Sequence, residues 1–185
     1  MHVLRLLRIF IPLLLVAAIV AGTVLVLTSR SELQDSRKQV DSAWAPLRTQ
    51  LDDRYLTLIA ANRSVREVPG PLHQIVTQVA AGYEDWRNLE RDNGSVTSQV
   101  DAANNLDALG RRLVQSATVA PRLKDNKTAL KPINVFAALS PPDQAGSFNA
   151  AVAHFEKERN RPARQPAARI LGYGQIPTYE ASGPA

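Results

Sequence analysis

The stretch IFIPLLLVAAIVAGTVLVLT, residues 9–28, decides how the rest of the chain is interpreted. It holds 20 residues without a charge, with Arg5 and Arg8 before it and Arg30 after it. A helix of about 20 apolar residues crosses the roughly 30 Å hydrocarbon core of a bilayer and satisfies its own backbone hydrogen bonds there. The stretch therefore predicts a transmembrane helix, preceded by a short basic segment at residues 1–8.

Three alternatives to a permanent anchor fit this stretch less well. A secretory signal peptide has an apolar region of about 7–15 residues and a small-x-small cleavage site, whereas this stretch is longer and continues as Ser-Arg-Ser-Glu. A lipoprotein anchor needs a cysteine, and the chain has none. A buried helix of a soluble protein normally carries a polar face. We therefore expect a single-pass membrane protein.

Small residues within the predicted span suggest a surface for helix packing. Ala17 pairs with Ala21 and Ala18 with Gly22 at a spacing of four. Small residues at this spacing let a second helix approach closely in lipid. The alternative is that alanine and glycine are simply frequent in anchors, and the sequence does not decide between the two.

Beyond the anchor, apolar residues recur with the spacing of a long helix that packs lengthwise against partners. From Val40 they follow one another at steps of three, four and seven, with Arg54 inside the seven-residue step, and Pro46 is expected to kink the rod. The seam consists of Val40, Trp44, Leu47, Leu51, Leu58, Ala61 and Val65.

Further helices are predicted by the same spacing and by their stop signals. We expect helices over residues 72–92 and 96–119, with Ser95 as the cap of the second. Pro121 and Pro132 predict a short helical piece at 122–131 and then a connector. A last helix is expected to be capped by Ser140 and to end at Pro162.

The sequence thus predicts an all-α protein with no sheet. One transmembrane helix leads into an elongated antiparallel bundle of three to four helices over residues 29–162, followed by a Pro/Gly-rich C-terminal segment at 163–185. The expected core residues are Trp44, Leu47, Leu51, Leu58, Val79, Trp86, Leu106, Leu113, Phe148, Val152 and Phe155.

Two blocks of the sequence resemble the LemA family. The first is Val40-Asp-Ser-Ala-Trp44 with Leu47, Gln50-Leu51 and Arg54-Tyr55, and the second is Phe148-Asn-Ala-Ala-Val152 with Phe155, Arg159, Pro162, Leu171-Gly-Tyr173, Ile176-Pro177 and Tyr179-Glu180. The family's Ile-Pro-Asn-Leu segment appears only as Leu58-Ile-Ala-Ala-Asn62, so the chain resembles a diverged member. The resemblance implies a membrane-anchored helical bundle, and it brings no catalytic residues.

The chemistry expected of an enzyme or a metal site is missing from the sequence. Without cysteine there is no thiolate ligand or thiol nucleophile, and His2, His73 and His154 stand alone. The carboxylate pairs Asp52-Asp53 and Glu84-Asp85 point in different directions on a helix. We therefore expect a non-enzymatic protein without cofactor, metal or small-molecule substrate.

A basic segment offers a second candidate surface. Residues 108–131 carry six cations against one acid, namely Arg111, Arg112, Arg122, Lys124, Lys127 and Lys131 against Asp125. Such a patch can face anionic lipid or an acidic protein surface, and a solvated helix face is the default interpretation. Nucleic acid is not expected as a partner, because no aromatic residues are interleaved with the cations.

The sequence leads to a hypothesis about function and orientation. We expect a scaffold or accessory subunit that docks on an integral membrane complex or on other envelope proteins of a bacterium, a respiratory-chain assembly being one conceivable host. A membrane-tethered sensor, receptor or enzyme and an anionic-lipid-binding module are the alternatives. The N-terminus is expected in the cytoplasm and the bundle outside, because Arg5 and Arg8 directly precede the apolar run, an arrangement that usually holds the short end inside. The count of Lys and Arg beside the span, two before it against three after it, leans slightly to the opposite orientation, but long domains translocate largely regardless of their charges.

Overall fold

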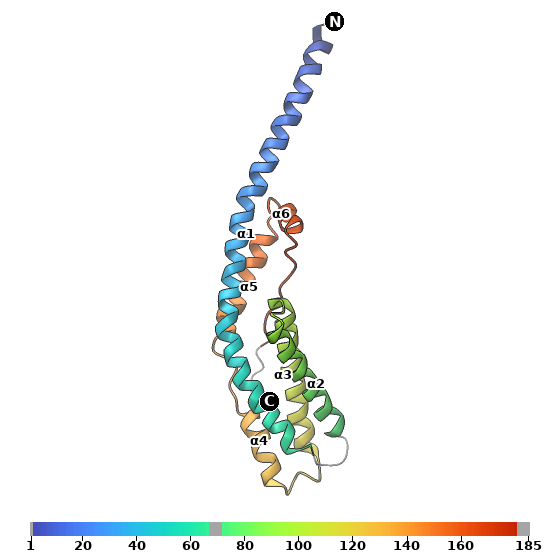
Figure 1. The fold of residues 1–185 in the computed structure, drawn as a ribbon, viewed down its shortest axis with the longest axis vertical. Coiled ribbons are helices and arrows are strands. Elements are labelled where there is room, and N and C mark those ends of the chain that lie inside the picture. Colours follow the sequence, from blue (N-terminus) through green and yellow to red (C-terminus); the bar gives the residue numbers. More distant parts are fainter. Residues whose placement is uncertain (1, 67–71, 181–185) are drawn as a thin grey trace. The chain divides into compact units, whose positions relative to one another are not determined.

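The chain is all-α in the computed structural model, which describes the backbone of residues 2–66 and 72–180 and the side chains of residues 30–66 and 72–180. Within these ranges there are six helices and no strand, and the helices pack as a bundle (Figure 1). They are α1 (His2–Ser64), α2 (Leu72–Arg91), α3 (Val96–Val119), α4 (Lys127–Ala137), α5 (Ala145–Arg159) and α6 (Gln165–Ile170). The predicted absence of a sheet is confirmed for the described part of the chain.

The helices form two compact units. The first comprises Met1–Gln39 and Ala153–Gln175, and the second comprises Val40–Val152 and Ile176–Ala185. Two helices, α1 and α5, therefore contribute residues to both units.

The seam predicted on α1 is the core of the second unit. Every one of its seven residues is buried, as are all the other expected core residues. The helix continues through Pro46, whose side chain is exposed. An exposed proline leaves the unbonded carbonyl four residues earlier accessible to water, which lowers the cost of the missing hydrogen bond.

An aromatic cluster joins α1, α2 and α5 within this unit. The ring of Trp44 lies 5.1 Å from that of Phe148 and 6.3 Å from that of Trp86, and Tyr55 meets Trp86 edge-on at 5.2 Å. Each buried indole N–H has an acceptor: Trp86 donates to Asp52 at 2.9 Å, and Trp44 donates to a glutamine of α3 at 2.7 Å. Such pairing is what makes a buried tryptophan stable.

Helices α2 and α3 lie side by side (Figure 1). The predicted cap of α3 is confirmed, because the hydroxyl of Ser95 accepts a hydrogen bond from the backbone N–H of Ser98 at 3.1 Å. Gly110 of α3 allows close contact with α4: a Cβ atom there would lie 2.7 Å from the ring of Phe136.

The predicted break at Pro132 is wrong. Helix α4 runs through this proline, and the connector expected after it is the second half of the helix. The helix begins at Lys127 and is capped by Asn126, whose side chain accepts from the backbone N–H of Ala129 at 3.0 Å. Burial of Ala129, Ile133 and Phe136 on one face offsets the hydrogen bond that the proline removes.

The predicted cap of the last helix is also wrong. Helix α5 begins at Ala145, five residues after Ser140. Ser140 and Pro141 each precede a proline, and a residue in that position is disfavoured in the helical conformation. The backbone N–H of Gln144 instead donates to the side chain of Gln50 on α1 at 3.2 Å.

The first unit has its own small core and ion pairs. Leu33 packs with Ala167 and Ala168, and the ring of Tyr173 meets Phe155 edge-on at 6.1 Å. The carboxylate of Glu158 is buried and pairs with Arg164, and with Arg161 at 2.8 Å. The short helix α6, which contributes the two alanines, was not predicted from the sequence.

No helix in the described part of the chain is long and apolar enough to cross a membrane. The predicted span at residues 9–28 lies outside the residues whose side chains are described, although its backbone belongs to α1. The span stays a prediction.

Candidate functional site

The small residues proposed for helix packing fall on the same part of α1. Ala17, Ala18, Ala21 and Gly22 follow one another on a helical backbone, and their surroundings lie outside the described side chains. Their role in membrane-helix packing stays a prediction.

The predicted basic residues are distributed over α3, α4 and the turn between them. Arg111 and Arg112 lie on the second half of α3, Arg122 and Lys124 lie in the turn, and Lys127 and Lys131 lie on α4. All are exposed except Arg111, which is half-buried. The structure therefore confirms that these cations are at the surface.

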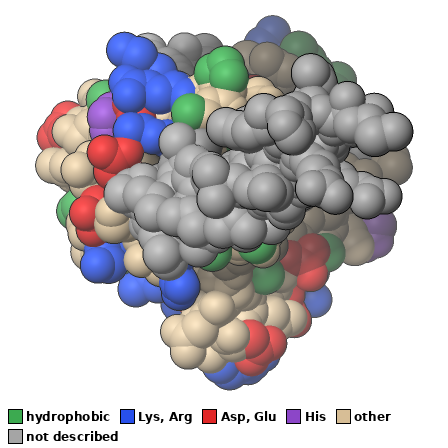
Figure 2. All heavy atoms as spheres, turned by 90° about the horizontal axis from the view of Figure 1, so that it is seen from above, with side chains coloured by type: hydrophobic (Ala, Val, Ile, Leu, Met, Phe, Trp, Pro, Cys, Tyr) green, Lys and Arg blue, Asp and Glu red, His purple; other side chains and the backbone are tan. Residues whose placement is uncertain are grey.

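The side of α4 opposite its buried residues combines cations with apolar side chains. Val135 is 50% exposed there, and an open groove of about 580 Å³ runs along the helix. We call this surface the α4 face; it is lined by Lys127, Leu130, Lys131, Asn134, Val135 and Ala138. Among the described side chains that are visible in Figure 2, basic and acidic groups are interspersed.

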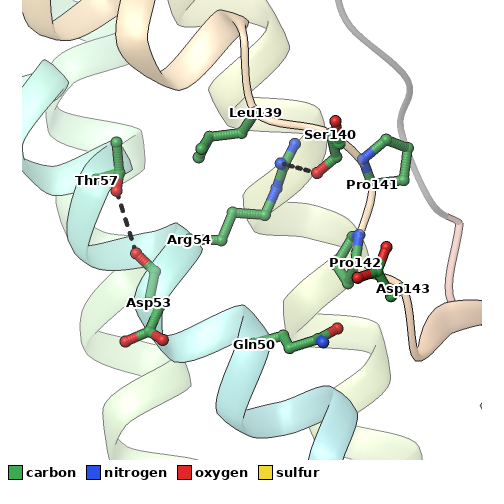
Figure 3. A pocket seen from close by; sticks show the side chains of 9 residues that line it. All are labelled: Gln50, Asp53, Arg54, Thr57, Leu139, Ser140, Pro141, Pro142 and Asp143. Atoms are coloured by element: carbon green, nitrogen blue, oxygen red, sulfur yellow. Dashed lines mark hydrogen bonds between the residues drawn. The ribbon is translucent and has the colours of Figure 1, made fainter.

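A pocket of about 310 Å³ lies next to Arg54 (Figure 3). The guanidinium extends from α1 towards the segment before α5, and its Nη1 donates to the carbonyl oxygen of Ser140 at 3.3 Å. Asp53 and Asp143 also line the pocket. The pocket is lined by Gln50, Asp53, Arg54, Thr57, Leu139, Ser140, Pro141, Pro142 and Asp143, a set without an imidazole that could activate a hydroxyl group.

The charge of Arg54 is already compensated inside the bundle. Its Nε donates to Asp107 at 3.0 Å, and the two side chains are 9% and 1% exposed. The guanidinium also lies 5.1 Å from the centre of the Phe136 ring. The other carboxylate oxygen of Asp107 accepts from the hydroxyl of Tyr179. The pocket therefore presents no uncompensated cation to an anionic ligand, and Arg54 is mainly structural.

The two tyrosines of this network are held in their neutral form. Burial, followed by the nearby carboxylate of Asp107, raises the pKa of Tyr179 and the pKa of Tyr55. Tyr55 donates to the backbone carbonyl of Ala103 at 3.0 Å. Both phenols thus act as hydrogen-bond donors, which suits a structural network.

Other residues considered from the sequence do not converge. His73 and His154 are exposed, and no group of three or more potential metal ligands occurs among the residues that the structure describes. Asp52, expected on a solvated face, is half-buried because it accepts the indole N–H of Trp86. Its neighbour Asp53 is exposed, as expected.

Sequence reasoning did not identify two asparagines whose side chains bind the backbone near Tyr179. Asn104 on α3 and Asn149 on α5 each make two hydrogen bonds to the backbone of residues 178–180. Asn149 lies in the block Phe148–Val152 quoted for the LemA resemblance, but no sequence signal marked either asparagine as a partner of residues 178–180, since these residues lie far apart in the chain.

In comparisons with known proteins, no family model matches the chain, and no curated protein or solved structure is significantly similar to it. The resemblance to the LemA family stays a prediction, carried only by the residues quoted for it.

Proposed function

We propose that this chain is a non-enzymatic, single-pass membrane protein that docks as an accessory subunit on a larger membrane protein complex. In this proposal residues 9–28 span the bilayer, and a LemA-like antiparallel bundle stands outside the cytoplasm. The observation that carries the proposal is the α4 face, where the exposed Val135 and the half-buried Leu130 lie beside two lysines.

The chemistry of the α4 face defines the partner. Lys127 and Lys131 are one helical turn apart and flank Leu130, with Val135 one turn further on. A partner helix that presents carboxylates beside apolar residues would complement both features. Apolar contact supplies the affinity of such an interface, while the charge pairs determine register and partner choice.

The test is affinity purification of the full chain in mild detergent, followed by mass spectrometry. The docking variant is Lys127→Glu/Lys131→Glu/Val135→Asp. A matched control, Lys157→Glu/Ile170→Asp, makes similar changes at exposed positions of α5 and α6. We expect the wild type and the control to retain the same integral membrane protein and the docking variant to lose it. Retention by the docking variant, or no enrichment by the wild type, would refute the proposal.

The five exposed cations of the basic segment favour a second candidate function, binding of anionic lipid. The lipids that co-purify with each variant distinguish the two. If the docking variant loses anionic phospholipid and keeps every protein partner, the α4 face binds lipid and not a protein.

A further inference from the structure

The segment Ile176–Glu180 lies on the second unit in an extended conformation. Ile176 and Tyr179 are buried, the latter to 1% exposure, whereas Thr178 and Glu180 are exposed. Two side chains three residues apart therefore enter the bundle, and the residues around Tyr179 point outward. We call this segment the tail and the surface that receives it the tail groove.

The tail groove binds the backbone of the tail through two asparagine side chains. Asn149 accepts from the N–H of Tyr179 at 2.9 Å and donates to the carbonyl of the same residue at 2.9 Å. Asn104 donates to the carbonyl of Thr178 at 3.0 Å and accepts from the N–H of Glu180 at 2.8 Å. In an extended chain, the N–H and C=O groups of one residue point to one edge, and those of its two neighbours point to the other edge. Asn149 therefore binds one edge of the tail and Asn104 binds the other.

A side-chain pocket adds selectivity to this backbone binding. The ring of Tyr179 is buried, and its hydroxyl donates to Asp107, the carboxylate that also pairs with Arg54. The pocket thus selects an aromatic residue with a donor at its tip, because a phenylalanine would leave one carboxylate oxygen of Asp107 without that donor. Pro177 fixes an extended conformation at Ile176.

The two residues directly before the tail, Gly174 and Gln175, are not built into either core, whereas Tyr173 packs in the first unit. Gly172 has a φ of +68°, and a Cβ atom at Gly172 or Gly174 would meet no atom within 4 Å. Gly174 and Gln175 are exposed. A ligand-like segment is thus joined to the rest of the chain by a short glycine-containing linker.

We propose that the tail groove is a recognition site for an extended peptide with the pattern Ile-Pro-x-Tyr, which the chain fills with its own tail and which the tail of a second copy fills in trans. We name the tail of a second copy as the occupant in trans, because it offers the same backbone groups and the same tyrosine as the chain's own tail. Each copy has one groove and one tail, so exchange between two copies gives a closed pair.

The covalently attached tail competes with any peptide at an effective concentration of the order of millimolar. The test therefore uses two full-length variants. The tail variant, Ile176→Ala/Tyr179→Ala, has an intact groove and a tail that cannot fill it. The groove variant, Asn104→Ala/Asn149→Ala, has an intact tail and a groove that has lost its backbone contacts.

The first measurement is binding of a fluorescent peptide, Gly-Gln-Ile-Pro-Thr-Tyr-Glu (residues 174–180), to each variant in mild detergent. We expect saturable binding to the tail variant and about tenfold weaker binding when the tyrosine of the peptide is replaced by phenylalanine. The tail variant that also carries the two asparagine substitutions should not bind. A folded tail variant that fails to bind, or that binds a scrambled peptide equally well, would overturn the proposal.

The second measurement tests the second copy as occupant. Mixing the two variants should give a heterodimer beyond any self-association that each variant shows alone. Adding Tyr179→Phe to the groove variant should weaken this heterodimer. Peptide binding without a heterodimer would overturn exchange between copies.

A chain with a cleavable linker covers the case in which the tail variant does not fold. A specific protease site inserted after Gly174 allows the tail to be cut from a chain that folded with the tail in place. Exchange of the cut tail for the fluorescent peptide supports the proposal, and failure of the peptide to enter overturns it.

Discussion

Replacing Asp107 by asparagine should be among the most destabilising single changes in this protein. The substitution keeps the size of the side chain and removes its charge. Arg54 is then left as a buried cation without a counter-charge: the amide oxygen at position 107 and the Ser140 carbonyl are neutral acceptors, and the Phe136 ring lies beside it. Tyr179 also loses a charged acceptor.

The magnitude follows from burial. Removing one partner of a buried ion pair costs about 3–5 kcal/mol, against roughly 0–1 kcal/mol for a pair at the surface. With side chains 9% and 1% exposed, Arg54 and Asp107 form a buried ion pair, so the larger cost applies. For a chain of this length each kcal/mol lowers Tm by about 2–4 °C, so the expected loss is roughly 6–20 °C.

The assay is thermal unfolding of the full chain in mild detergent, followed by tryptophan fluorescence. Asp101→Asn is the matched control, since Asp101 is an exposed aspartate on the same helix, and it should change Tm by no more than about 2 °C. Adding Arg54→Met to Asp107→Asn removes the unpaired cation, so the double variant should melt above the single one. A shift below about 2 °C for Asp107→Asn would show that the pair is hydrated and that the reasoning fails.

Three further changes test other parts of the bundle by the same thermal assay. Trp86→Ala should cost about 3–5 kcal/mol, because the indole is fully buried, and an unchanged Tm would place it outside the core. Gly110→Ala should lower Tm because its Cβ would lie 2.7 Å from an aromatic ring of α4, whereas Gly146→Ala, with nothing within 4 Å, should not. Burial and then the neighbouring Asp52 raise the pKa of Glu90, so the folded state gains from protonation of Glu90 and loses that gain as the pH rises above about 4.3. The Tm of Glu90→Gln relative to wild type should therefore rise between pH 4 and pH 7, and a constant difference would contradict the shift.

The helices of the bundle were largely predictable because hydrophobic spacing reports burial directly. Steps of three, four and seven placed Leu47, Leu51 and Leu58 in the core, and their burial confirms this. Local rules failed where tertiary contacts compete with them. Pro132 predicted a break, but the apolar face of α4 is buried strongly enough to carry the helix through it.

The candidate surfaces were predictable only in part. Charge counting located the lysines of α4, yet the exposure of Val135, one turn beyond them, depends on which face of α4 is buried, and the fold decides that. The position of Arg54 in the apolar seam marked it as unusual, but its partners are Asp107, 53 residues away, and the carbonyl of Ser140, 86 residues away. Long-range polar pairing leaves no periodic signal in a sequence.

The separation of Tyr179 from Asp107 also has a consequence for the newly made chain. Asp107 accepts hydrogen bonds from Arg54, which precedes it in the chain, and from Tyr179, which follows it. A ribosome must add 72 residues after Asp107 before Tyr179 has been made. At about 5–20 residues per second this takes roughly 4–14 s. During this interval α3, α4 and α5 are completed, while the groove to which α3 and α5 contribute still lacks its tyrosine. Final consolidation of the domain is therefore tied to late translation, and we expect nascent chains arrested before Tyr179 to be cleaved by proteases much faster than finished ones.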